Sequence, residues 1–168
     1  SELVGSAEIR GETVELIDVS YFIRLADSAG AAPAPQRVLF VSDDQLVRDM
    51  LCPALSAAGY SVATTAIPAD TSELIGQIGA FDAVILDTDA ACLSTPAALR
   101  ALRERKDAAS VPAIGISKNP TPRAARIATE SGMTSLVSKH DRHMLLDTLA
   151  HALDAAADAK ATTMELAA

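Results

Sequence analysis

Short apolar runs alternate with segments of helical periodicity from residue 37 onward. The apolar runs are Val38–Val41, Ser61–Thr64, Ala83–Leu86, Val111–Ile116 and Ser135–Val137, and the helical patterns are Gln45–Ala58, Ser72–Ile78, Ala97–Arg105, Arg123–Glu130 and Asp141–Ala157. Runs that are apolar throughout are typical of strands buried on both faces, and helices between them supply the crossovers of a parallel sheet. The pattern therefore predicts an α/β domain over residues 37–159, a doubly wound sheet of five parallel strands in five βα units.

The chain before residue 37 has a different character. Residues 28–36, SAGAAPAPQ, contain nothing that could anchor a core, which predicts a linker. Two β-type runs and an apolar patch precede it: Ala7–Arg10, Thr13–Val19 and Tyr21–Leu25. Residues 1–27 are too few to form a stable core, so we interpret them as the end of another domain and the chain as a piece of a longer protein. Residues 160–168 lack periodicity and are predicted to form a frayed tail or a further linker.

Composition narrows the classes of function. The 168 residues carry a formal net charge of −8, and this negative field disfavours binding to nucleic acid or to anionic membranes. No apolar run approaches the length of a membrane span and no signal peptide is recognisable, so a cytoplasmic protein without membrane insertion is expected. Cys52 and Cys92 lack metal-site or redox spacing and are interpreted as structural thiols.

Polar residues follow four of the predicted strands. They are Ser42-Asp43-Asp44, Asp87-Thr88-Asp89, Ser117-Lys118 and Ser138-Lys139. The carboxyl ends of parallel strands lie along one edge of a sheet, so these carboxylates, hydroxyls and ammonium groups are expected to converge. Carboxylates that close together need a cation, and hard oxygen ligands favour Mg²⁺. A carboxylate beside Mg²⁺ and a lysine is suited to accepting a phosphoryl group.

These residue types suggest individual roles. Asp87, at the tip of the central strand, is the predicted phosphoryl acceptor and a metal ligand. Asp43 and Asp44 are predicted to bind Mg²⁺, with the main-chain carbonyl of Asp89 completing the shell. The alternative for a single aspartate after a strand is a helix cap, and Asp44 could cap helix 45–58. The joint placement of such residues at four strand ends favours the chemical interpretation.

Three segments resemble the strand signatures of receiver domains of two-component signalling. They are FDAVILD at 81–87, VPAIGIS at 111–117 and SGMTSLVSK at 131–139. The resemblance covers most of residues 37–159 and implies the flavodoxin-like, CheY-like receiver fold. It also implies Mg²⁺-dependent transfer from a phosphohistidine domain onto Asp87, with Ser117 following the phosphoryl group and Lys139 binding it.

Three positions depart from the family pattern. Residues 87–92, DTDAAC, lack the Met-Pro that usually follows the acceptor, and Leu136 replaces the aromatic residue of the usual activation switch. His140 stands where a proline commonly follows the lysine. These differences predict an acceptor with unusual output, acting as a switch or as a phosphate sink.

Two further similarities concern the parent protein. Val4–Val19 is similar to the closing strands of the CheW-like domain of the chemotaxis histidine kinase CheA, and residues 139–142, together with Pro53, resemble receivers fused to such kinases. This implies the carboxyl-terminal part of a hybrid CheA, with residues 1–27 as a CheW-like remnant. CheW-like coupling proteins and chemoreceptors are then expected partners of the parent protein, and the chain alone is not a kinase.

Two other functions remain open. A receiver fold kept for phosphorylation-independent docking is one, with its switch lost at Leu136. The other is a phosphatase of the haloacid-dehalogenase type, because residues 84–89, VILDTD, resemble its Asp-x-Asp motif. In that case Asp89 is the general acid and Ser117 and Lys139 bind phosphate. The upstream position of Asp43-Asp44 and the lack of a cap domain argue against the phosphatase.

Overall fold

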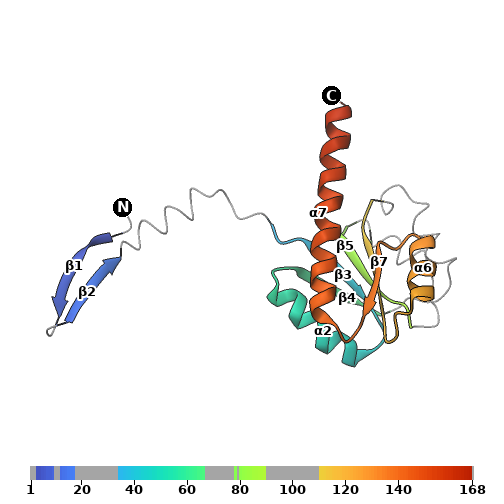
Figure 1. Ribbon diagram of the computed structural model, residues 1–168, viewed down its shortest axis with the longest axis horizontal. Helices are drawn as coiled ribbons and strands as arrows, with labels where there is room; N and C mark the ends of the chain where they lie inside the picture. The colour runs from blue at the N-terminus through green and yellow to red at the C-terminus, as the bar shows by residue number, and fades with distance from the viewer. Residues whose placement is uncertain are drawn as a thin grey trace. The chain divides into compact units, whose positions relative to one another are not determined.

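The computed structural model describes residues 3–9, 12–17, 34–66, 78, 80–89 and 110–167. The chain divides into two compact units, Ser1–Ala34 and Pro35–Ala168. In the smaller unit, β1 (Leu3–Ile9) pairs with β2 (Glu12–Ile17) as an antiparallel hairpin, drawn in blue in Figure 1. The two β-type runs predicted at the amino terminus therefore form strands, and the origin of this hairpin in a CheW-like domain stays a prediction.

The larger unit is built on one parallel sheet (Figure 1). Its strands are β3 (Arg37–Val41), β4 (Ser61–Thr65), β5 (Ala83–Asp87), β6 (Ala113–Ser117) and β7 (Ser135–Ser138). They lie in the order β4-β3-β5-β6-β7, and every neighbouring pair is parallel. The predicted five-stranded, doubly wound sheet is confirmed, and β5 is central and buried along its whole length.

Three helices belong to the described part of this unit: α2 (Gln45–Ala57), α6 (Pro122–Glu130) and α7 (Arg142–Leu166). Two predicted helices, Ser72–Ile78 and Ala97–Arg105, lie outside the described residues except for Ile78, which is helical and buried. Helix α2 presents residues at four-residue spacing to the core, and Gly59 follows it with a φ of 97°, a conformation that suits glycine.

The alternating side chains of the strands build a core on each face of the sheet. On one face, Phe40 packs with residues of α2 and α7, including Leu51 and Leu149. On the other, Leu86 packs in a cluster that includes Ala128 of α6. Both faces are thus covered, as continuously apolar strands require, and the carboxyl edge of the sheet is left for polar residues.

Helix α7 is longer than the sequence predicts. It runs without interruption to Leu166, so the expected frayed tail from Lys160 on is wrong. Its buried residues end at Leu153, and alanine-rich residues 154–161 continue the helix through their intrinsic preference rather than through packing.

In the parts of the chain that the structure describes, no helix combines the length and the hydropathy that a lipid bilayer span requires.

Candidate functional site

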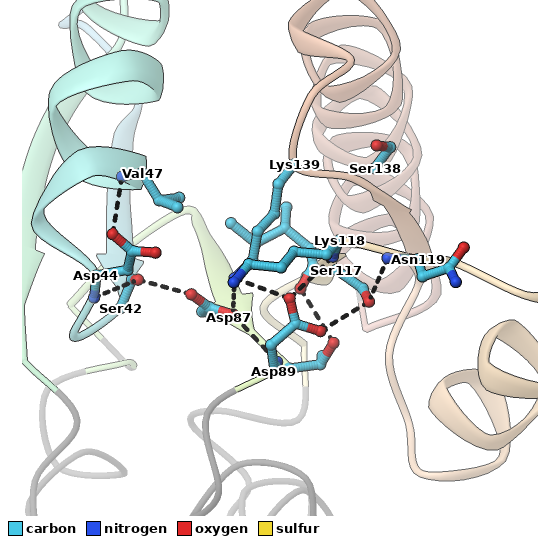
Figure 2. A network of polar contacts seen from close by, with 12 residues as sticks. Ser42, Asp44, Val47, Asp87, Asp89, Ser117, Lys118, Asn119, Ser138 and Lys139 are labelled. Carbon is cyan, nitrogen blue, oxygen red and sulfur yellow. Dashed lines mark hydrogen bonds and ion pairs between the residues drawn. The ribbon is translucent and has the colours of Figure 1, made fainter.

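A polar cluster occupies the carboxyl edge of the sheet (Figure 2). Its buried members are Ser42 after β3, Asp87 at the end of β5, Ser117 at the end of β6 and Lys139 after β7. The four strand ends therefore meet as the sequence predicts. Asp87 is 3% exposed and Lys139 is 2% exposed, so water is largely excluded from both charged groups.

Both carboxylate oxygens of Asp87 have partners. Lys139 Nζ lies 2.6 Å from Oδ1, which also accepts a hydrogen bond of 3.1 Å from the main-chain amide of Asp89. The hydroxyl of Ser42 donates to Oδ2 over 2.7 Å. A charge this deeply buried requires such compensation, and the three donors hold the carboxylate in a single orientation.

The side chain of Asp89 forms a second carboxylate centre beside the first. Oδ2 lies 2.9 Å from Lys139 Nζ and accepts 2.8 Å from the main-chain amide of Lys118, while Oδ1 accepts 2.8 Å from the Ser117 hydroxyl. In the receiver interpretation, sequence reasoning gave Asp89 a role only through its main-chain carbonyl, and its side chain had a role only in the phosphatase alternative. The motif Asp-Thr-Asp was a signal that its side chain could reach the same cluster.

The contacts between the Lys139 ammonium group and the two carboxylates explain the direction in which the pKa values of Asp89 and Lys139 are shifted. Burial by itself raises the pKa of Asp89, but hydrogen bonds from Lys139, the Lys118 amide and Ser117 outweigh this effect and lower the pKa below its ordinary value. Burial likewise lowers the pKa of Lys139, yet the hydrogen bonds and charges of Asp87 and Asp89 raise it overall. The cluster is therefore stabilised with its lysine charged and Asp89 ionised.

Backbone contacts fix the ends of the strands that carry the cluster. The amide of Thr88 donates to the Ile116 carbonyl over 3.0 Å, and the amide of Lys139 donates to the Ser117 carbonyl over 2.9 Å. The amide of Asn119 donates to the Ser117 hydroxyl over 3.2 Å. These bonds place Ser117 between the strands that bear Asp87 and Lys139.

Ser42 was expected at this edge of the sheet, but sequence reasoning gave it no role. Its hydroxyl donates to Asp87 and accepts from the Asp44 amide over 3.1 Å. The signal was its position directly after a buried strand, one residue before the acidic pair. A hydroxyl thus lies against Asp87 where a carboxylate would add repulsion.

The structure gives Asp44 the capping role that the sequence left as an alternative. Asp44 Oδ1 accepts from the amides of Leu46 and Val47, at 3.0 and 3.4 Å, and the residue is the N-cap of α2. Asp43 is exposed. Metal binding by either residue stays a prediction.

The contribution of the Asp44 cap to stability can be measured with two variants. Asp44→Ala is expected to lower the free energy of unfolding by about 1 kcal/mol, because two amides at the start of α2 lose their acceptor. Asp44→Asn keeps an acceptor oxygen and should stay within a few tenths of a kcal/mol of the parent, roughly the difference between good caps. Urea denaturation followed by circular dichroism makes the comparison. Equal stability of the alanine and asparagine variants would contradict the cap.

The cluster suits Mg²⁺ in the chemistry of its donors. Among the described residues, no group of three or more His, Cys, Asp or Glu side chains is arranged to hold a metal ion. Mg²⁺ needs fewer protein ligands than that, since it commonly keeps several waters and binds one or two carboxylates. Asp87 and the exposed Asp43 are carboxylates of the right kind, whereas Asp44 already uses its Oδ1 to cap α2.

No protein-family model and no curated protein sequence matches the chain. Several solved structures, in contrast, are similar to it. The chemotaxis protein CheY4 of Vibrio cholerae is 25% identical, with a TM-score of 0.60, over 71% of this chain and 99% of its own. A CheY-like response regulator receiver domain protein from Methanospirillum hungatei is 19% identical, with a TM-score of 0.61, over 74% and 98%.

A third similar structure contains a metal. The receiver domain of a sensor histidine kinase from Pseudomonas aeruginosa, described with a magnesium ion coordinated in its active-site cleft, is 22% identical, with a TM-score of 0.61, over 72% of this chain and 99% of its own. The larger unit of the present chain therefore has the CheY-like, flavodoxin-like receiver fold.

Proposed function

We propose that the larger unit is a working receiver domain that accepts a phosphoryl group on Asp87. The observation that carries the proposal is the buried Asp87 carboxylate at the end of the central strand, 2.6 Å from Lys139 Nζ. A buried acceptor held beside an ammonium group is arranged for charge stabilisation during phosphoryl transfer.

The chemistry follows from these positions. One Asp87 oxygen attacks the phosphorus of a phosphohistidine, the P–N bond breaks, and the imidazole leaves with the electron pair. Lys139 and Ser117 stabilise the equatorial oxygens of the transferred group. Mg²⁺, when bound by Asp87, Asp43, the Asp89 carbonyl and, as the sequence also predicts, Asp44, supplies positive charge to the same oxygens. Water later hydrolyses the acyl phosphate, which releases inorganic phosphate and regenerates the carboxylate.

The proposed context is a hybrid chemotaxis kinase of the CheA type. The hairpin of β1 and β2 ahead of the linker supports a preceding domain, and the sequence resemblance supports a CheW-like one. The receiver domain of a sensor histidine kinase is among the similar structures. The phosphoryl donor is then a phosphohistidine domain of the same or a partner kinase, and the receiver serves as a switch or as a phosphate sink.

The test uses a small phosphoryl donor. Incubation with acetyl phosphate and Mg²⁺ is expected to add one phosphoryl mass to the intact chain, as Asp87 attacks phosphorus and acetate leaves. Asp87→Asn should abolish the addition, whereas Asp82→Asn, a charge-matched change before the start of β5, should label like the parent. Labelling of the Asp87→Asn chain at the parent's rate would refute the acceptor assignment.

One observation favours a second candidate, a phosphorylation-independent docking module. Asp87 and Asp89 share Lys139, so the cluster is compensated by the protein's own donors. A protein of that kind would show no Mg²⁺-dependent change in its amide spectrum on addition of beryllofluoride, which mimics an aspartyl phosphate. The phosphatase is less favoured, because its motif belongs on the first strand of the fold, whereas β5 follows β3 and β4.

A further inference from the structure

Three donors of different kinds converge on the side chain of Asp89 (Figure 2). They are the Ser117 hydroxyl at 2.8 Å, the Lys118 main-chain amide at 2.8 Å and Lys139 Nζ at 2.9 Å. They come from the ends of β6 and β7 and meet beside Asp87. A hydroxyl, an amide and an ammonium group together make a binding site for an oxyanion.

We propose that the carboxylate of Asp89 occupies the subsite that the phosphoryl oxygens on Asp87 would enter, and thereby restrains phosphorylation. The inference rests on the proposed function, since Ser117 and Lys139 are the groups assigned to the phosphoryl oxygens. A phosphoryl group and the Asp89 carboxylate are both anionic and need the same donors. They cannot share the subsite without strong repulsion.

Differences in burial show which partner can move. Lys139 is 2% exposed and Ser117 is buried, so the donors are held by the core. The Asp89 side chain is 31% exposed and can exchange its contacts for water by rotating outward. The Asp89 side chain is therefore the part that leaves the subsite, and Lys139 retains its contact with Asp87 when Asp89 rotates outward.

Occupation of the subsite by Asp89 also explains why the buried polar atoms of the cluster all have hydrogen-bond partners. In the described part of the chain, every buried side-chain nitrogen and oxygen has a hydrogen-bond partner. For Ser117, the Asp89 carboxylate is the acceptor of its hydroxyl proton. The unphosphorylated protein therefore needs no external anion at this position. An incoming phosphoryl group must displace the Asp89 carboxylate.

The experiment removes the side chain and leaves the main chain in place. Asp89→Ala is expected to be labelled by acetyl phosphate with Mg²⁺ at least tenfold faster than the parent, measured by intact mass against time. The predicted metal contact of Asp89 is through its carbonyl, which the variant keeps. Asp89→Asn, which retains the size of the side chain but loses its charge, should also be faster than the parent. It decides the question if the alanine variant does not fold.

Asp82→Asn is the matched control, because it removes one carboxylate at the opposite end of the same strand, where Asp82 accepts from the Arg37 amide. Its labelling rate should equal that of the parent, so a rise confined to the Asp89 variants supports the restraint. Equal rates for the parent and both Asp89 variants would overturn it while leaving Asp87 as the acceptor.

A binding measurement separates this inference from the proposed function. If no variant is labelled, phosphoryl acceptance has failed, and sulfate titration then decides the role of Asp89. The Lys118 amide resonance of Asp89→Ala should respond at a sulfate concentration at least tenfold lower than in the parent. The same response in both proteins would reject occupation of the subsite by Asp89.

Discussion

Lys139→Met is expected to lower the free energy of unfolding by about 3 kcal/mol at neutral pH. Lys139 lies within 2.9 Å of two carboxylates, and its removal leaves Asp87 charged and 3% exposed without its cation. Breaking a buried ion pair from one side typically costs about 3–5 kcal/mol. We expect the lower end because the Asp89 side chain is 31% exposed and can be solvated. Urea denaturation measures the loss.

A neighbouring lysine provides the control. Lys118 is exposed, and Lys118→Met should change stability by less than about 0.5 kcal/mol, as surface substitutions usually do. Adding Asp87→Asn to the Lys139→Met chain should restore much of the lost stability, since the unpaired buried charge is gone. Lys139→Met and Lys118→Met of equal stability would show that the ion pair contributes nothing.

The contribution of the Lys139–Asp89 ion pair to the free energy of unfolding depends on pH in a direction that the pKa shifts determine. The pKa of Asp89 lies below its ordinary 3.8, so its contribution is present above that value and is lost as the pH falls through the lowered pKa. The pKa of Lys139 lies above its ordinary 10.5, so its contribution is present below that value and is lost as the pH rises through the raised pKa. The difference between the parent and Lys139→Met should therefore be largest near neutral pH and shrink toward both extremes.

The sheet could be predicted because its three inner strands, β3, β5 and β6, are largely buried on both faces and therefore mostly apolar. Each predicted strand was found with its bounds shifted by no more than two residues, as for Val111–Ile116 against Ala113–Ser117. The end of α7 could not be predicted in the same way. Periodicity reports packing against the core, and α7 continues past Leu153 without burying further side chains.

The candidate site could be predicted by residue type but not in its contacts. Parallel strands bring their carboxyl ends together, which was enough to join Asp87 with Lys139. Which side chain points inward depends on the backbone where the strand ends. Asp44 has an extended backbone (φ −80°, ψ 106°) that directs its carboxylate to the amides of α2, and Ser42 takes the contact with Asp87. An offset of two residues thus exchanges a carboxylate for a hydroxyl in the cluster.

Phe40→Ala is expected to lower the free energy of unfolding by about 3–5 kcal/mol, the range for truncating a buried aromatic side chain. Phe40 is fully buried in β3 and belongs to the cluster that joins the sheet to α2 and α7. Phe40→Leu keeps much of the apolar volume and should lose roughly half as much or less. Thermal and urea unfolding of both variants give the values, and a loss below about 1 kcal/mol for alanine would contradict this packing.

The same variant tests whether the stability of the core and the chemistry of the edge are separable. Strand β3 pairs with β5 along Val38 to Val41 and is followed by Ser42, so the core under Phe40 supports Asp87 through the placement of β3. The bonds from Lys139 and Ser42 to Asp87 do not involve Phe40. Under conditions in which Phe40→Ala is still folded, its labelling rate with acetyl phosphate should match the parent's. A rate that falls in proportion to the stability lost would mean that the acceptor geometry depends on core packing and not on the ion pair alone.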